Sequence, residues 1–224
     1  MSQSETVSIR VPAGLPERTV LEGRYVRLEP LDAERHAGDL FDAVAANADA
    51  RHRWLFEHAP ADRPAMRQWA ERAAASKDPL FSAVVDRATG RAGGRQSLMR
   101  ITPDHGVVEI GNILWGEGIA GTRLATEALY LSAVYVFETL GYRRFEWKCN
   151  DLNEPSKRAA SRFGFSFEGV FRQHMVVKGE NRDTAWFAML DRDWADLKVG
   201  YEAWLDPANF DAKGRQQQKL SLPR

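Results

Sequence analysis

One segment limits the fold of this chain more than any other. The apolar stretch Val107 to Trp115 is typical of a strand, and a loop that contains Gly116, Gly118 and Gly121 follows it directly. Apolar residues then recur at helical spacing from Thr122 to Leu140, where Gly141 is placed to end a helix. A helix that links two neighbouring strands makes them parallel, so we expect the next strand, Arg143 to Cys149, to run parallel to the first.

Antiparallel elements are expected on both sides of this unit. Alternation predicts a strand over Tyr25–Glu29, and strand-like stretches bounded by turn residues predict strands over Leu80–Asp86, Arg91–Ile101, Phe165–Val177 and Arg182–Leu190. Helical patterns predict helices over Ala33–Ala48, Pro64–Ser76, Asn153–Gly164 and Trp194–Trp204. We therefore predict an α/β fold with a mixed, mostly antiparallel sheet and one central parallel βα crossover. We divide the chain into an arm (1–20), a main domain (21–194) and a C-terminal helix with a polar, mobile tail (195–224).

Composition excludes several classes of function. Lys and Arg total 31 and Asp and Glu total 31, so the formal net charge is zero and offers no field to attract nucleic acid or an anionic membrane. We find no apolar run of about 18 residues and no signal peptide, and Cys149 is the only cysteine, so we expect a cytoplasmic protein. The five histidines lack metal-ligand spacing, so we expect them on the surface or in loops and expect no metal. A homodimer is left open.

The glycine loop predicts a site for an anion. Free N–H groups at a helix N-terminus attract phosphate, and glycine lets a backbone approach it closely. Gly116 to Gly121 also matches the G-x-G-x-x-G pattern of dinucleotide-binding folds. We disfavour that interpretation because the acidic residue Asp151 comes 30 residues after Gly121, later than the usual ~20. A second set of parallel strands is also missing.

Several motifs together resemble the RimJ/RimL branch of the GNAT superfamily of N-acetyltransferases. They are E-I-G at Glu109–Gly111, A-T-E-A-L at Ala125–Leu129, N-x-x-S at Asn153–Ser156 followed by Gly164-Phe165, and R-D-T-A-W-F-A-M-L at Arg182–Leu190. The resemblance covers about Leu21 to Trp194. It implies the GNAT acyl-CoA N-acyltransferase fold. It also implies transfer of an acetyl group from acetyl-CoA to a primary amine, on a protein N-terminus or a small molecule, by direct attack in a ternary complex.

The resemblance also implies where acetyl-CoA binds. The backbone of Ile113, Leu114 and Trp115 would pair with the pantetheine, and the pyrophosphate would lie on Gly121, Thr122, Arg123, Leu124 and Ala125. Asn153 and Lys157 complete the predicted cofactor residues. The resemblance implies that Lys157, Arg158 and Arg162 contact the 3′-phosphate; the alternative is that they form a solvated helix face. The loop departs from the family pattern because Ala120 replaces the usual Arg or Gln and Arg123 replaces a glycine. Arg123 either restores positive charge near the pyrophosphate or obstructs it.

Two residues are candidates for acid–base catalysis. Glu109 lies on the strand beside the expected thioester and is a candidate base for the incoming ammonium; the alternative is a solvent-facing or ion-paired glutamate. The family tyrosine that protonates the thiolate is replaced by Ala160, and we consider Ser156 as its substitute. The alternative for Ser156 is a first-turn serine that satisfies a backbone amide. Trp54 and Phe56 fall in the segment that borders the acceptor pocket in this family.

Two other functions remain open. The altered loop is compatible with a CoA-binding or acyl-CoA-binding protein without turnover. The resemblance also does not exclude an acyltransferase that uses another donor, such as succinyl-CoA.

Overall fold

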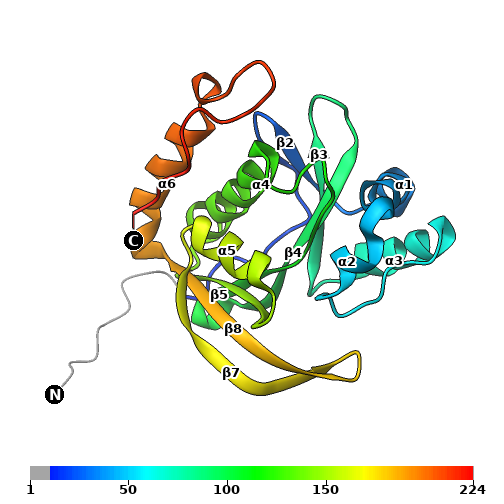
Figure 1. Ribbon diagram of the computed structural model, residues 1–224. Helices are drawn as coiled ribbons and strands as arrows, with labels where there is room; N and C mark the ends of the chain where they lie inside the picture. The colour runs from blue at the N-terminus through cyan, green and yellow to red at the C-terminus, as the bar shows by residue number, and fades with distance from the viewer. Residues whose placement is uncertain (1–10, 224) are drawn as a thin grey trace.

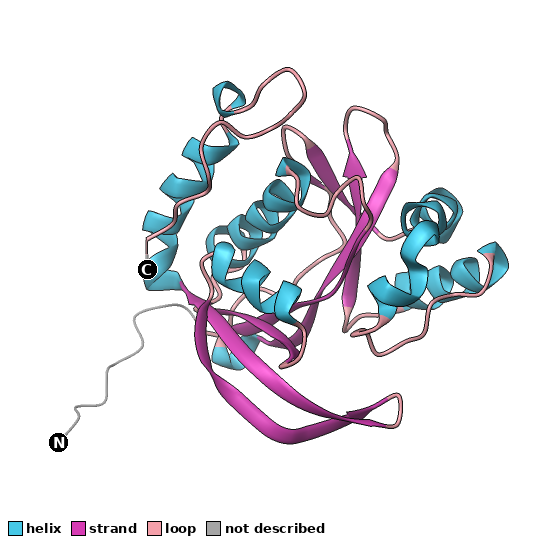
Figure 2. Ribbon diagram, in the orientation of Figure 1, coloured by secondary structure: helices cyan, strands magenta, loops and turns pink. Residues whose placement is uncertain are grey.

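An eight-stranded sheet runs through the part of the chain that the computed structural model describes, residues 11–223 (Figures 1 and 2). The strand order is β1-β2-β3-β4-β5-β6-β8-β7, and only the pair β5–β6 is parallel. The strands are β1 (Leu21–Glu22), β2 (Val26–Pro30), β3 (Leu80–Asp86), β4 (Ala92–Thr102), β5 (Val107–Trp115), β6 (Arg144–Asn150), β7 (Ser166–Val177) and β8 (Glu180–Leu190). The predicted fold class is confirmed.

Helices cover both faces of the sheet (Figure 1). Helices α1 (Ala33–Val44) and α3 (Arg63–Ala75) pack on the face that holds Ala83 and Val85, whereas α4 (Arg123–Val134) packs on the face that holds Val84. These three residues belong to β3. Successive residues of a strand point to opposite faces of the sheet, so β3 is buried on both sides. Helix α5 (Glu154–Arg162) follows β6, and α6 (Asp191–Leu205) follows β8.

Side-chain caps fix where the helices next to β5 and β6 begin. The Thr122 hydroxyl accepts a hydrogen bond from the Leu124 N–H (3.1 Å), which sets the start of α4. The Asn153 side chain accepts one from the Ser156 N–H (3.2 Å), which sets the start of α5. Both caps lie at the ends of loops that leave the parallel strands, so they position two helix N-termini beside the same edge of the sheet.

Two of the predicted helices differ from a regular α-helix. The helix expected over Ala33–Ala48 is divided into α1, a 3₁₀ turn (Ala45–Asn47) and α2 (Ala48–His52). The end of α1 lies against the Gly116 backbone, where a Cβ would stand 2.4 Å from the Ala43 carbonyl oxygen, so this end is held by tertiary contact. The helix expected over Thr122–Leu140 ends in a π turn (Tyr135–Thr139), closed by a Leu140 N–H to Tyr135 C=O bond of 3.0 Å.

A buried glutamate joins α4 to the start of the sheet. Glu127 accepts hydrogen bonds from the backbone N–H groups of Arg24 (2.8 Å), Tyr25 (2.6 Å) and Val26 (2.7 Å). Gly23 lies against this carboxylate, since a Cβ there would stand 2.6 Å from the Glu127 carboxyl carbon. One side chain therefore satisfies the turn between β1 and β2 and fixes α4 on the sheet.

The ends of the described chain pack onto the main body. The Gly14 N–H donates to the Leu140 carbonyl (2.7 Å), and residues 1–10 of the predicted arm lie outside the described residues. The tail, which we expected to be polar and mobile, returns along α6, and Leu220 and Leu222 pack against the main core. The domain boundaries at 20 and 194 stay a prediction.

The prediction that the histidines lie on the surface or in loops is wrong for His36 in α1 and His52 in α2. His36 is 3% exposed and its Nε2 lies 3.3 Å from a Glu29 oxygen, while His52 is 2% exposed and its Nδ1 lies 2.8 Å from the Ala48 carbonyl oxygen. Each ring finds a polar partner within its own neighbourhood, and this allows it to be buried.

Candidate active site

A bulge in β5 separates the two parallel strands. Their pairing ends at Ile110 and Trp147, and β5 shifts register against β4 over the next residues. Asn112 adopts a left-handed backbone conformation (φ 51°), which asparagine tolerates better than most residues. Ser97 donates to the Gly111 carbonyl (3.1 Å) and Arg95 to the Asn112 carbonyl (3.0 Å), so β4 holds the bulge in place.

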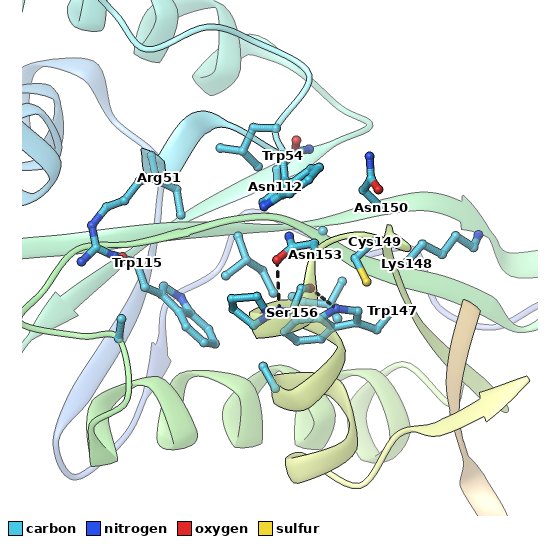
Figure 3. A pocket seen from close by; sticks show the side chains of 18 of the residues that line it. Arg51, Trp54, Asn112, Trp115, Trp147, Lys148, Cys149, Asn150, Asn153 and Ser156 are labelled. Atoms are coloured by element: carbon cyan, nitrogen blue, oxygen red, sulfur yellow. Dashed lines mark hydrogen bonds between the residues drawn. The ribbon is translucent and has the colours of Figure 1, made fainter. Parts of the chain in front are cut away.

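The strands diverge into a cavity of about 580 Å³, which is within the range of small-molecule sites (Figure 3). Its walls come from α2 and the segment after it, the end of β4, β5, β6, the start of β8, the loop and first turn of α4, and α5. They include Arg51, Trp54, Phe56, Arg100, Glu109, Asn112, Ile113, Leu114, Trp115, Gly121, Thr122, Ala125, Trp147, Lys148, Cys149, Asn153, Ser156, Arg158, Arg162 and Arg182. Segments far apart in the sequence therefore meet at one site.

One end of the cavity is suited to an anion. Gly121 and Thr122, which precede α4, line it together with Arg158 and Arg162 of α5. Arg162 donates to the Thr126 hydroxyl in the first turns of α4 (3.1 Å), which ties the two helices together there. Burial lowers the pKa of Arg162 from its usual range. A helix N-terminus beside two arginines is a favourable environment for a pyrophosphate or phosphate group.

The wall near the end of the parallel pairing carries a buried ion cluster. Glu109 is 2% exposed, and its Oε2 lies 2.6 Å from Arg100 Nη1 and 3.0 Å from Lys148 Nζ. Lys148 also lies 2.6 Å from a Glu146 oxygen. Of the two interpretations of Glu109, the ion-paired one describes its contacts, and the same side chain lines the cavity.

Ser156 lies at the opening of α5 between two partners (Figure 3). Its N–H donates to Asn153, and its hydroxyl oxygen accepts a hydrogen bond from the Trp147 indole N–H at 2.9 Å. Because the indole supplies the proton of that bond, the serine hydroxyl retains its own proton to donate. The capping residue is therefore Asn153 and not Ser156, whose hydroxyl contacts the Trp147 indole instead of a backbone amide and lies beside the cavity.

Most of the predicted site residues come together at this cavity. Glu109 and Ser156 line it with the predicted cofactor residues Ile113, Leu114, Trp115, Gly121, Thr122, Ala125 and Asn153. The side chains of Arg123, Leu124 and Lys157 are not part of its lining.

These three side chains have other neighbours. The Arg123 guanidinium carbon lies 4.3 Å from the Tyr25 ring centroid and 5.2 Å from that of Phe210. Leu124 packs with the core between α4 and the first strands, and Lys157 pairs with Asp151 (3.2 Å) and Glu154 (2.7 Å). The Arg123 side chain therefore lies over these two rings and outside the lining of the cavity.

Sequence reasoning missed several side chains of the cavity. Arg51 donates to the Trp115 carbonyl (2.5 Å), and Trp147 and Arg182 line walls for which we assigned no residue. On the hairpin, Lys178 donates to the His52 carbonyl (2.7 Å), so the turn between β7 and β8 contacts α2. The broken helix that positions Arg51 has no local sequence signal, so spacing alone did not reveal this contact.

Two kinds of feature are not found within residues 11–223. This part of the chain has no group of three His, Cys, Asp or Glu residues placed to hold a metal ion. Its helices are also too short or too polar to cross a membrane.

A bulged strand, a diverging parallel pair and a helix N-terminus at one cavity define an acyl-CoA-dependent transferase. The model of the family described as the acetyltransferase (GNAT) domain matches residues 26–166, well over half of the chain. The protein belongs to this GNAT acetyltransferase family, as the motifs predicted. It is an N-acetyltransferase whose family transfers an acyl group from acyl-CoA to an amine.

Several known proteins are similar to this chain, including the following three. A GCN5-related N-acetyltransferase from Brucella melitensis is 56% identical with a TM-score of 0.92, over 94% of this chain and 96% of that one. The "Uncharacterized N-acetyltransferase p20" of Bacillus licheniformis is 31% identical over 51% of this chain, and the match spans 64% of that relative, slightly under two thirds. The "Putative ribosomal N-acetyltransferase YdaF" of Bacillus subtilis (strain 168) is 28% identical over 76% of this chain and 92% of that relative, in agreement with the RimJ/RimL resemblance.

Proposed function

We propose that this protein transfers an acetyl group from acetyl-CoA to a primary amine by direct attack in a ternary complex. The observation that carries the proposal is the continuity of the cavity. It extends from Gly121 and Arg158 at the anion end, past the bulge at Asn112, to Trp54 and Phe56. Donor and acceptor would therefore be bound together, which direct transfer requires.

We assign acetyl-CoA to the anion end and the diverging strands. The backbone of Ile113 to Trp115 would pair with the pantetheine, and the amides from Gly121 to Ala125 would hold the pyrophosphate. Arg158 and Arg162 are better placed than Lys157 for the phosphates, because they line the cavity while Lys157 is engaged by two carboxylates. Asn153 would act by holding the start of α5 in position.

The reaction needs two proton transfers. The amine nitrogen attacks the thioester carbonyl carbon, the C–S bond then breaks, and the departing thiolate gains a proton. We propose Ser156 as the donor of that proton, which solvent then replaces. We propose Glu109 as the group that takes the proton from the ammonium, directly or through water. Its Oε2 already contacts two cations, so Oε1 is the oxygen that we expect to accept it.

Thiol release with acetyl-CoA and a panel of amines tests this function. A positioned acid or base contributes about 10²–10⁴ in rate, so Ser156→Ala should lower kcat by about 10²-fold with little change in CoA affinity. Glu109→Gln should lower kcat/KM most near neutral pH and less as pH rises and free amine accumulates. Ser161→Ala, on the same helix but exposed, is the matched control.

Two results would contradict the roles proposed for Ser156 and Glu109 or the transfer reaction itself. If both variants keep the kcat/KM of the unmodified enzyme from about pH 6 to 9, neither residue is an acid or base, and proximity and backbone polarisation carry the rate. If no amine releases thiol while CoA still binds, the protein is a CoA-binding protein and not a transferase.

A further inference from the structure

Arg182, at the start of β8, is a buried cation without an ion-pair partner among the described residues. It is 7% exposed and lines the cavity. Its guanidinium forms no hydrogen bond or ion pair with any residue from 11 to 223, and its Nε is buried without a partner. The Phe56 ring lies against this charged group, with its centroid 5.1 Å from the guanidinium carbon.

The other buried cations of the protein have partners. Arg95 is 1% exposed and pairs with Glu57 and the Asn112 carbonyl, and Lys148 pairs with Glu109 and Glu146. Leaving a buried charge unpaired costs several kcal/mol, and native structures leave few polar groups in that state. Burial accordingly lowers the pKa of Arg182 from its usual range. An unpaired buried arginine that faces a cavity indicates that a ligand supplies its partner.

The location of Arg182 indicates whether this ligand is a CoA phosphate or part of the acceptor. Arg158 and Arg162 lie on α5 and line the cavity, and the bond from Arg162 to Thr126 places Arg162 beside the first turns of α4. Arg182 instead lies beyond the strand pairing of Cys149 with Ala185 and of Asn150 with Thr184, and it contacts Phe56. It therefore belongs to the acceptor half of the cavity, away from the groups that would hold the CoA phosphates.

We propose that Arg182 binds a carboxylate carried by the amine acceptor. This inference rests on the proposed function. A guanidinium presents a planar fork of N–H donors that matches a carboxylate, and the pair is strongest where water is excluded. Glu109 lines the same cavity and attracts the ammonium of such an acceptor. The site thus favours an amine with a carboxylate close to it, such as an amino acid, over an uncharged amine or the N-terminus of a neutral peptide.

The experiment compares matched acceptors with acetyl-CoA as donor. Thiol release is measured with free amino acids, with the corresponding amino-acid amides and with a neutral, C-terminally amidated peptide. We expect kcat/KM to be at least about tenfold higher for the acids than for the amides. Arg182→Met, which keeps the apolar stem, should lower kcat/KM for the acids by about 10–100-fold and for the amides by less than about twofold. Arg182→Lys should retain part of the preference, because it keeps the charge but loses the fork.

Controls separate the ways in which this inference can fail. Arg172→Gln removes an exposed positive charge from the same hairpin and should change neither rate. CoA-induced thermal stabilisation of each variant shows that it is folded and binds the donor. Equal rates for acids and amides, a preference for the neutral peptide, or equal loss on both acceptors in Arg182→Met would overturn the inference while leaving acetyl transfer intact.

A last arm tests whether the carboxylate belongs to the acyl group. A preference for succinyl-CoA over acetyl-CoA with amide acceptors, lost in Arg182→Met, would place the carboxylate on the donor and overturn the acceptor assignment. Absence of thiol release with every amine would instead refute the proposed function itself.

Discussion

At the scale of single residues, Arg123 has a role that can be separated from cofactor binding. Its guanidinium lies over the rings of Tyr25 and Phe210, so it links the start of α4 to two distant segments. Arg123→Ala should leave CoA affinity within about twofold and lower the free energy of unfolding by about 1 kcal/mol, the usual worth of such contacts. Calorimetric titration and urea unfolding measure the two effects. A tenfold loss of CoA affinity would show that the side chain does reach the pyrophosphate.

Buried histidines make the stability depend on pH. Burial lowers the pKa of His36 and of His52 below the value of about 6.5 expected in the unfolded chain. Below about pH 6.5 the unfolded state therefore binds more protons than the folded state. The free energy of unfolding does not change with these histidines above about pH 6.5. It falls as the pH drops from about 6.5 towards the lower pKa values of the folded state. Each histidine contributes a slope of at most about 1.4 kcal/mol per pH unit.

Urea unfolding between about pH 7 and 5 measures this slope. His52→Gln should flatten it relative to the unmodified protein, whereas His58→Gln, at an exposed position, should not. A slope that is the same in all three proteins would show that these rings do not couple folding to protonation.

At the scale of elements, Glu127 holds α4 to the turn between β1 and β2. Glu127→Ala removes the acceptor of three backbone N–H groups and leaves them buried in part. We expect a loss of about 3–5 kcal/mol in the free energy of unfolding. Glu71→Ala removes an exposed pair with Arg67 and should cost less than about 1 kcal/mol. Equal losses in the two variants, measured by urea unfolding, would contradict this role.

The sequence predicted the elements well where the pattern was local. The alternation over Tyr25–Glu29, the turn residues between the strand-like stretches and the glycine loop before α4 were sufficient to predict the sheet and its one parallel crossover. The breaks in helices were not predictable, because the end of α1 is decided by contact with Gly116 and the π turn forms where Tyr135, Val136 and Phe137 are buried. Both breaks depend on tertiary contacts, and the helical periodicity of the sequence does not predict such contacts.

At the scale of the whole molecule, charge is distributed unevenly although the formal net charge is zero. The cavity is lined by six cationic side chains (Arg51, Arg100, Lys148, Arg158, Arg162 and Arg182) and one carboxylate (Glu109). Net charge, available from the sequence, could not reveal this, because the six residues come from five separate segments. Motif order did predict the backbone part of the site, since β5, α4 and α5 are close in sequence.

The cationic lining of the cavity and the strand–loop–helix unit before α4 predict that the protein binds CoA and not NAD. At about 100 times its dissociation constant, CoA should stabilise the fold by about 2.7 kcal/mol, a rise of roughly 5–10 °C in Tm. The shift at a fixed subsaturating concentration should shrink with added salt, because screening weakens the attraction to phosphates. NAD should have no effect. A flat melting curve with millimolar CoA, or equal shifts with both nucleotides, would contradict the assignment of the anion end.

The position of Cys149 allows ligand binding to be measured by thiol labelling of the unmodified protein. It is the only cysteine of the chain, is 5% exposed and lines the cavity between the two substrate halves. Burial raises the pKa of its thiol, so labelling by a small thiol reagent is slow and must proceed through the cavity. A bound substrate blocks that path, and the labelling rate therefore measures occupancy in the unmodified protein. Every ligand considered above can be ranked in this way, whether or not it turns over.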